Sequence, residues 1–346
     1  MMMVEDPYYP MYMYPPPMEL DVSQYLPPVE YIDHSQDIPG SSNQHLNRDD
    51  YYKLIYHMKL SRNELYKNGY PLMIDSARNL VHIEPNQFTQ PVIMAGDRRR
   101  KCVRCNEHFT LDKYGRVPVI PGSCSFHQRG SYNTPYGPRK NCCNQPIHQS
   151  KGCTMMNVHV FDNMEEEDMY KFVKTPQADG PDDCRSMNVL AIDCEMAYTN
   201  KGLSLVKVSV VDMNGILLLD QIVRPEGQLL CPNTMYSGVT AAEINGSTVS
   251  LESVQKMLFT LINAETILIG HSLESDLKAL RLVHTNVVDT AVIYMEYGIK
   301  PSLRSLTSTH LGKLIQQDKG IYETHNSVED AVSCIELIEN LVANKL

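Results

Sequence analysis

The spacing of apolar residues changes along the chain, and each spacing predicts a different element. Short apolar runs and alternating segments predict strands, whereas apolar residues that recur every three or four positions predict helices. Strands that first follow one another and then alternate with helices are typical of a mixed α/β sheet flanked by helices. We expect five strands, at 189–192, 205–212, 216–223, 266–270 and 286–293, and helices at 251–263 and 273–284, with two more helices closing a domain that covers 187–346.

The first half of the chain is less regular. Residues 1–30 hold 6 Met, 5 Tyr and 7 Pro. Because Pro is poorly tolerated in helix interiors and sheet ladders, we expect a disordered tail over 1–46, with a docking motif for a protein partner as a further role. Apolar residues at helical spacing predict a helical segment over 47–97, whose helical hairpin ends near Tyr70-Pro71. Residues 161–186 are acidic and contain two Pro, which predicts a linker.

Composition narrows the functional classes. The 346 residues carry a formal net charge of −10, which argues against a generic nucleic-acid binder. No apolar run approaches the roughly 18 residues that a membrane helix needs, so we expect no membrane span. The N-terminal stretch has neither a basic start nor an unbroken apolar run, so it is not a secretory signal. The ten Cys are therefore expected to be reduced thiols or metal ligands.

Acidic residues stand at the ends of three predicted elements. Asp193 and Glu195 close an apolar strand two residues apart, so both carboxylates point to one face. Asp276 lies in the first turn of a helix that follows a buried strand, and His325 and Asp330 lie at the start of the last helix. Carboxylates that share a site repel each other unless a cation lies between them, and such oxygen ligands suit Mg²⁺ or Mn²⁺.

Each motif alone has a plain structural explanation. The first pair could form a polar strand end in water, and Asp276 could stabilise a helix dipole. Asp330 could be a capping acid paired with Ser327, and His325 could be a surface histidine in a loop. The occurrence of all three motifs in one chain favours a shared site over three separate explanations.

The order of these residues resembles the DEDDh class of 3′→5′ exonucleases, which have a ribonuclease-H-like fold. Several stretches are similar to motifs of the RNA exonuclease 1 homologue family: LAIDCEMAYT, SGVT, ILIGHSLESDLKALRLVHTNVVDT and HNSVEDA. The resemblance extends upstream through KNGYPL and the Cys-rich region and covers about 60–346. It departs from the family pattern at Ala197, where a Cys is expected.

By this resemblance, Asp193, Glu195, Asp276 and Asp330 would hold two divalent ions, Mg²⁺ or Mn²⁺. Such ions, about 3.5–4 Å apart, stabilise the attacking and leaving oxygens of a phosphodiester. His325 would be the general base that takes a proton from the attacking water. The products would be a nucleoside 5′-monophosphate and an RNA shortened at its 3′ end.

The resemblance also implies the substrate contacts and the partner. Met196, Ala197 and His271 lie beside the acidic residues and are expected to touch the 3′-terminal nucleotide. RNA is the expected partner, in RNA processing or turnover, but no single residue separates RNA from DNA. Two other functions therefore stay open: a catalytically silent nucleic-acid-binding adaptor, and a 3′→5′ exonuclease that acts on DNA.

Cys and His residues gather in the region 98–160, which we name the Cys/His module. The pattern Cys-x2-Cys, followed after 18 residues by Cys-x2-His, is typical of zinc sites, and a second group of four ligands follows. The order also resembles the cysteine- and histidine-rich (CHORD) zinc domain. Buried free thiols are the alternative, and the order alone does not say which ligands share an ion. The eight candidates, enough for one or two structural Zn²⁺, are Cys102, Cys105, Cys124, His127, Cys142, Cys143, Cys153 and His159.

The same region is strongly basic. Residues 98–153 hold eleven Lys and Arg but two acids, a formal charge of +9, which leaves −19 for the remainder of the chain. A basic module on an acidic protein is typical of a phosphate-backbone binder, and Phe126, Tyr132 and Tyr136 could stack on bases. The alternative is a zinc-stabilised scaffold with a merely soluble basic face. The run 98–101 also resembles a nuclear signal, so we expect a nuclear protein, with the cytoplasm as the alternative.

Overall fold

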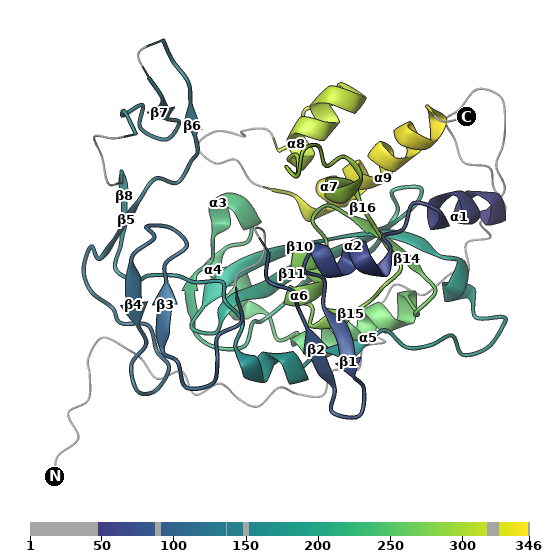
Figure 1. The fold of residues 1–346 in the computed structure, drawn as a ribbon, viewed down its shortest axis with the longest axis horizontal. Helices are drawn as coiled ribbons and strands as arrows, with labels where there is room; N and C mark the ends of the chain where they lie inside the picture. Colours follow the sequence, from purple (N-terminus) through teal and green to yellow (C-terminus); the bar gives the residue numbers. More distant parts are fainter. Residues whose placement is uncertain (1–47, 87–90, 136, 148–151, 317–324, 345–346) are drawn as a thin grey trace.

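In a computed structural model of the chain, a mixed sheet carries helices on both of its faces (Figure 1). The structure describes residues 48–86, 91–135, 137–147, 152–316 and 325–344. Five strands run in the order β12-β11-β10-β14-β16, and a short strand, β13, pairs with β10 beside them. These strands are β10 (Val189–Thr199), β11 (Gly202–Asp212), β12 (Leu217–Ile222), β13 (Leu229–Cys231), β14 (Ile267–Gly270) and β16 (Val287–Asp289).

The sheet matches the mixed five-stranded sheet that the pattern predicts, with β13 as an addition. β10, β11 and β12 are antiparallel, whereas β14 and β16 are parallel to β10 and to each other. The expected strand 286–293 is wrong in its second half. Asp289 ends β16, and its carboxylate accepts the backbone N–H of Ala291, which starts helix α7 (Thr290–Ile293).

Each face of the sheet has its own hydrophobic core. Along β10, Leu190, Ile192 and Cys194 pack toward one set of helices, and Val189 and Ala191 pack toward the other. This alternation follows from the two-residue period of a strand. The first face carries α5 (Leu251–Leu261) and α6 (Glu274–Ala279), and the second carries α7, α8 (Leu303–Leu306), the π-helical turn η4 (Thr307–Leu311) and α9 (Ser327–Ala343).

Among the described residues of the segment 47–97, helix ends at Lys67, so the expectation of a helical segment over its whole length is wrong. Pro71 cannot continue a helix, and the residues after it pair as a two-stranded ribbon. Ile55 packs in the core beside α9, whereas Leu65 packs in the core beside α5. The elements are α1 (Arg48–Tyr56), α2 (Arg62–Lys67), β1 (Leu72–Asp75) and β2 (Leu80–His82).

The acidic segment 161–186 is packed into the fold, so the linker prediction is also wrong. Phe161 and Phe172 are fully buried. Strand β9 (Val173–Lys174) pairs in parallel with β15 (Leu282–Val283), which ties the segment to the α/β domain. The acidic composition hid these few apolar anchors, which lie beside the short 3₁₀ turns η2 (Glu166–Tyr170) and η3 (Cys184–Met187).

The Cys/His module consists of three small antiparallel strand pairs and no helix in its described part. Phe126 and Val160 pack against Tyr198 of β10 and Cys231 of β13, so the module is docked on the α/β domain. The predicted tail 1–46 lies outside the described residues. The strands of the module are β3 (Arg99–Lys101), β4 (His108–Thr110), β5 (Cys124–Phe126), β6 (Ser131–Tyr132), β7 (Arg139–Lys140) and β8 (Thr154–Met156).

The pairing of β5 with β8 depends on Gly152. A Cβ atom at this position would lie 2.1 Å from the backbone nitrogen of Phe126, a distance that atoms cannot adopt. We predict that Gly152→Ala opens this strand pair, at a cost of about 1–3 kcal/mol. Hydrogen–deuterium exchange of residues 124–126 and 154–156 should accelerate. Gly130→Ala, whose Cβ would meet nothing within 4 Å, should leave exchange unchanged, and equal exchange in the two variants would contradict the account.

Candidate active site and cysteine–histidine clusters

Four carboxylates, named the acidic site, lie on β10, α6 and α9, and the charges of three of them act on the fourth, Asp193. The four residues are Asp193, Glu195, Asp276 and Asp330. The first two follow the alternation of β10 and therefore face α9 rather than α5. A register shift between β10 and β11 begins directly after Glu195. Asp276 and Asp330 lie in the first turns of α6 and α9, and both are buried, as is Glu195.

The electrostatics of the acidic site are unfavourable without a cation. Burial, together with the charges of Asp276, Glu195 and Asp330, raises the pKa of Asp193 well above its usual range. Burial and the charge of Asp330 raise the pKa of Glu195 to about 8, and burial raises the pKa of Asp276 to about 8. The Oε1 atom of Glu195 and the Oδ1 atom of Asp276 are buried with no hydrogen-bond partner. Such oxygens fit the needs of a divalent cation.

The first turn of α6 is positioned by Asp289, a residue that the search for acidic ligands did not single out. Asp289 is fully buried, and its Oδ1 accepts the backbone N–H of Ser272 at 2.9 Å. Its Oδ2 accepts the N–H of Leu273 at 3.3 Å and the hydroxyl of Tyr70 at 2.6 Å. Ser272 has a φ of +56°, a conformation rare outside glycine, so these bonds hold a strained turn directly before Asp276.

His325 lies beside the acidic site. Its Nδ1 is 3.5 Å from Oδ2 of Asp330, and its side chain is 37% exposed. Gln316, which sequence reasoning missed, donates from Nε2 to both carboxylate oxygens of Asp330 at 3.1 Å and lies 3.4 Å from Nδ1 of His325. No apolar period or charge pattern marks Gln316, and only the fold brings it beside Asp330.

The capping explanation for Asp330 is wrong. Asn326, rather than Ser327, caps α9, and its side chain accepts the backbone N–H of Val328. The hydroxyl of Ser327 instead lies 2.7 Å from that of Ser209 on β11. The carboxylate of Asp330 is thus left to face Gln316 and the acidic site.

The three predicted substrate contacts differ in their surroundings. Met196 lines a cavity of about 160 Å³ together with Lys201 and Lys278. His271 is half-buried, and its Nδ1 lies 2.9 Å from the hydroxyl of Thr290. The side chain of Ala197 has no exposed surface and packs in a small apolar cluster behind the sheet, which removes the basis for a nucleotide contact through it.

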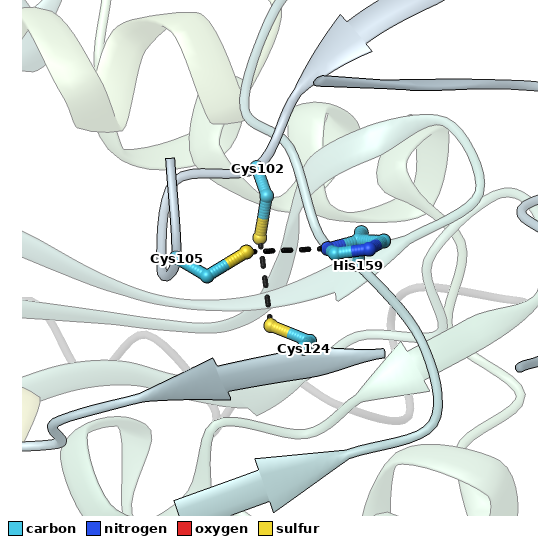
Figure 2. Close-up of side chains that lie close together, drawn as sticks. All are labelled: Cys102, Cys105, Cys124 and His159. Atoms are coloured by element: carbon cyan, nitrogen blue, oxygen red, sulfur yellow. Dashed lines mark hydrogen bonds between the residues drawn. The ribbon is translucent and has the colours of Figure 1, made fainter. Parts of the chain in front are cut away.

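The first Cys/His cluster joins Cys102, Cys105, Cys124 and His159 (Figure 2). Their ligand atoms all lie within 4.8 Å of one another, with Cys105 Sγ 3.3 Å from His159 Nδ1 and Cys102 Sγ 3.7 Å from Cys124 Sγ. Burial of Cys102 raises the pKa of its thiol. Hydrogen bonds, first those from the backbone N–H groups of Cys105 and Val160, have the larger total effect and lower the pKa to about 6. A thiolate is the form that binds a metal.

The second cluster joins His127, Cys142, Cys143 and Cys153, also within 4.8 Å. Sγ of Cys142 lies 3.5 Å from His127 Nδ1 and 3.4 Å from Sγ of Cys153. The neighbours Cys124 and His127 thus belong to different clusters, so the motif Cys-x2-His is split between two sites. Among the described residues, the two clusters are the groups compact enough to be tetrahedral sites for one ion each.

Two basic side chains of the module make contacts within the fold and are not available to bind RNA. The side chain of Arg100 is 2% exposed and pairs with Glu165 at 2.5 Å. The guanidinium of Arg104 stacks on Phe126 and Tyr198, which buries Phe126 and excludes it as a base-stacking platform. Tyr132 is 41% exposed, and Tyr136 lies outside the described residues. Arg99 and Arg116 are exposed but pair with Asp97 and Asp112, each at 2.8 Å. Arg98, Lys101 and Lys113 are exposed as well.

Within the described part of the chain, no helix combines the length and the apolar character needed to cross a membrane.

Comparison with known proteins adds to this geometry. No family profile matches the chain. The putative RNA exonuclease pqe-1 of Caenorhabditis elegans is 38% identical over 316 residues, which cover 89% of this chain and 19% of that protein. The human RNA exonuclease 1 homolog is 32% identical over 305 residues, 83% of this chain and 23% of that protein. This chain therefore spans less than half the length of the first relatives that it matches.

RNA exonuclease 3 of Eremothecium gossypii is closer in length. It is 31% identical over 296 residues, which cover 83% of this chain and 71% of that protein. The shared region therefore extends over most of both chains. The chain belongs to the family of RNA exonucleases that contains RNA exonuclease 1 homolog and RNA exonuclease 3.

Proposed function

We propose that the chain is a metal-dependent 3′→5′ exoribonuclease, which removes 5′-mononucleotides from RNA 3′ ends in RNA processing or turnover. The observation that carries this proposal is the acidic site, in which carboxylates from three separate elements act electrostatically on Asp193 and two buried carboxylate oxygens lack a hydrogen-bond partner. The names of the relatives support RNA as the substrate.

Asp193, Glu195, Asp276 and Asp330 would hold two divalent cations, Mg²⁺ or Mn²⁺. Carboxylate oxygens are the ligands that these hard ions prefer, and the ions would offset the repulsion within the acidic site. Bound ions of this kind lower the pKa of a water molecule and stabilise the charge on the attacking and leaving oxygens of the phosphodiester.

His325 would act as the general base. A carboxylate oxygen of Asp330, 3.5 Å from Nδ1, can accept the Nδ1–H and so leave the lone pair on Nε2 free to take a proton from water. Gln316 donates from Nε2 to both carboxylate oxygens of Asp330 at 3.1 Å. It thereby orients the carboxylate that accepts the Nδ1–H, and in this tautomer the Gln316 amide bonds to Asp330 rather than to the imidazole.

The Cys/His module would bind RNA upstream of the cleaved end and would be stabilised by two zinc ions. The first and second clusters supply the ligands, and the exposed residues Arg98, Lys101 and Lys113 supply positive charge for phosphates. Residence in the nucleus stays a prediction that rests on the run 98–101.

The central test is a time course on 5′-labelled RNA with a single-stranded 3′ tail and on its DNA counterpart, with Mg²⁺ or EDTA. We expect a ladder that shortens from the 3′ end of RNA and stops in EDTA. Asp193→Asn removes a charge but keeps the shape, so kcat should fall about 10³-fold or more while RNA binding is retained. Turnover by Asp193→Asn with Mg²⁺ would contradict the assignment, shortening of DNA alone would move the function to DNA, and binding without shortening would favour an adaptor.

The repulsion in the acidic site predicts a pH-dependent stability of the metal-free protein. Because the pKa of Asp276 is about 8 in the folded chain and near 4 when unfolded, the folded state retains a proton that the unfolded state loses between these values. Stability in EDTA should therefore fall as the pH rises from about 4 to 8. Asp276→Asn should raise Tm at pH 8 by about 2–4 °C or more and change it little near pH 4.

The control for this experiment is Asp182→Asn, since Asp182 is exposed and lies outside the three elements that carry the acidic site. Its melting temperature in EDTA should follow that of the unmodified protein at every pH. If Asp276→Asn melts at the same temperature as this control at pH 8, the carboxylates do not repel one another as described.

Zinc content tests the assignment of the two clusters. Elemental analysis of the purified chain should give two zinc ions per molecule. Cys105→Ser and Cys142→Ser each remove one thiolate from a different cluster, so each should lower the content toward one. Cys184→Ser, which changes an exposed cysteine outside both clusters, should leave two. Loss of both ions from Cys105→Ser, with the second cluster still folded by hydrogen exchange, would contradict two independent sites.

A further inference from the structure

Helix α3 (Thr234–Ser237) and the residue before it are hydrogen-bonded to residues that neighbour the ligands of both clusters in the Cys/His module. Arg104, which lies between two ligands of the first cluster, donates from Nη2 to Oδ1 of Asn233 at 3.4 Å, directly before the helix. The hydroxyl of Tyr236 donates to the backbone carbonyl of Gln128, the residue that follows the second-cluster ligand His127. Figure 1 shows α3 on the side of the α/β domain that faces the module.

The same helix contacts His325. The backbone N–H of His325 donates to the carbonyl oxygen of Tyr236 at 3.1 Å. The two rings meet edge to face, with their centroids 6.2 Å apart and their planes at 67°. Tyr236 therefore holds both the backbone and the ring of His325, while Asp330 and Gln316 occupy the Nδ1 side of the imidazole.

Such a contact can control a rate without adding much stability. Helix α3 has four residues, which is too short to be stable alone, and it lies between left-handed residues at Asn233 and Gly238. The position of α3 thus depends on its hydrogen bonds to the Cys/His module and to His325. A ring pair contributes only about 0.5–1.5 kcal/mol beyond its buried area, but a displacement of 1 Å in a catalytic group can lower a rate 10²-fold.

We propose that Tyr236 is a positioning residue through which the Cys/His module holds the catalytic histidine: the carbonyl of Gln128 fixes the Tyr236 hydroxyl, and Tyr236 fixes the backbone and ring of His325. The module thereby contributes to the hydrolytic step as well as to RNA binding. This inference rests on the proposed role of His325 as general base.

The test is a double-mutant cycle measured as kcat and KM on the single-stranded RNA tail. His325→Ala should lower kcat about 10²–10⁴-fold. Tyr236→Ala should lower kcat about 10–10²-fold while KM changes less than about twofold, because the ring acts on the base rather than on the affinity for RNA. Tyr236→Phe, which keeps the ring and loses the bond to Gln128, should have a smaller effect of the same kind. In the His325→Ala background, neither change at Tyr236 should lower kcat further.

Two controls keep folding separate from positioning. Tyr170→Ala changes a tyrosine of similar exposure outside the site and should leave kcat unchanged. The imidazole resonances of His325, observed in ¹⁵N-histidine-labelled protein, should shift in Tyr236→Ala but not in Tyr170→Ala. If Tyr236→Ala fails to fold, Tyr236→Phe still tests the inference, because it keeps the ring and removes only the hydroxyl.

The outcomes separate this inference from the proposed function. If His325→Ala lowers kcat but Tyr236→Ala and Tyr236→Phe stay within twofold of the unmodified protein, the inference is overturned and the general base stands. An equal loss from Tyr236→Ala with and without His325 would also overturn it. If His325→Ala itself keeps full kcat, the proposed base fails whatever the Tyr236 variants do.

Discussion

The gathering of four carboxylates, three of them buried, is the constraint on which the arrangement of the chain depends. Like charges in a buried site oppose folding, so the site persists only because the elements that carry it are fixed by apolar packing on both faces of the sheet. β10 supplies two carboxylates through its alternation, and α6 and α9 each supply one from a first turn. Protonation offsets part of this cost, since the pKa values of Glu195 and Asp276 are raised to about 8, and a bound cation would offset it at higher pH.

The segments that precede the α/β domain are part of the same arrangement. Tyr70, from the stretch after α2, donates to Asp289, and Asp289 holds the strained turn that leads to Asp276. The Cys/His module is hydrogen-bonded to Tyr236 of α3, and Tyr236 contacts His325. An α/β domain cut at residue 187 would therefore lack groups that contact Asp289 and α3.

The periods of apolar residues in the sequence predicted the features of the fold that depend on neighbouring residues. The alternation around Asp193 and the first-turn positions of Asp276 and Asp330 follow from strand and helix periods, so the mixed sheet and the acidic residues could be identified from the sequence. Contacts between residues far apart in the sequence could not be predicted in this way. Gln316 and Tyr236 follow no apolar period, and Cys124 and His127, only three positions apart, belong to different clusters. A few buried apolar residues anchor otherwise polar stretches, namely Val81 and Ile83 in β2 and after it and Phe161 and Phe172 in the acidic segment, and no periodic pattern marks them.

The most direct measurement of the central claim is the number of protons released when Mn²⁺ binds, obtained by calorimetric titration at pH 7 in buffers of different ionisation enthalpy. Glu195 and Asp276, with pKa values of about 8, hold protons in the metal-free site, and a cation must displace them. Because the pKa of Asp193 is raised as well, the account predicts release of about one to three protons per chain at pH 7, declining as the pH rises above 8. Binding without proton release, at a site that Asp193→Asn abolishes, would show that the carboxylates are already ionised and would contradict the claim.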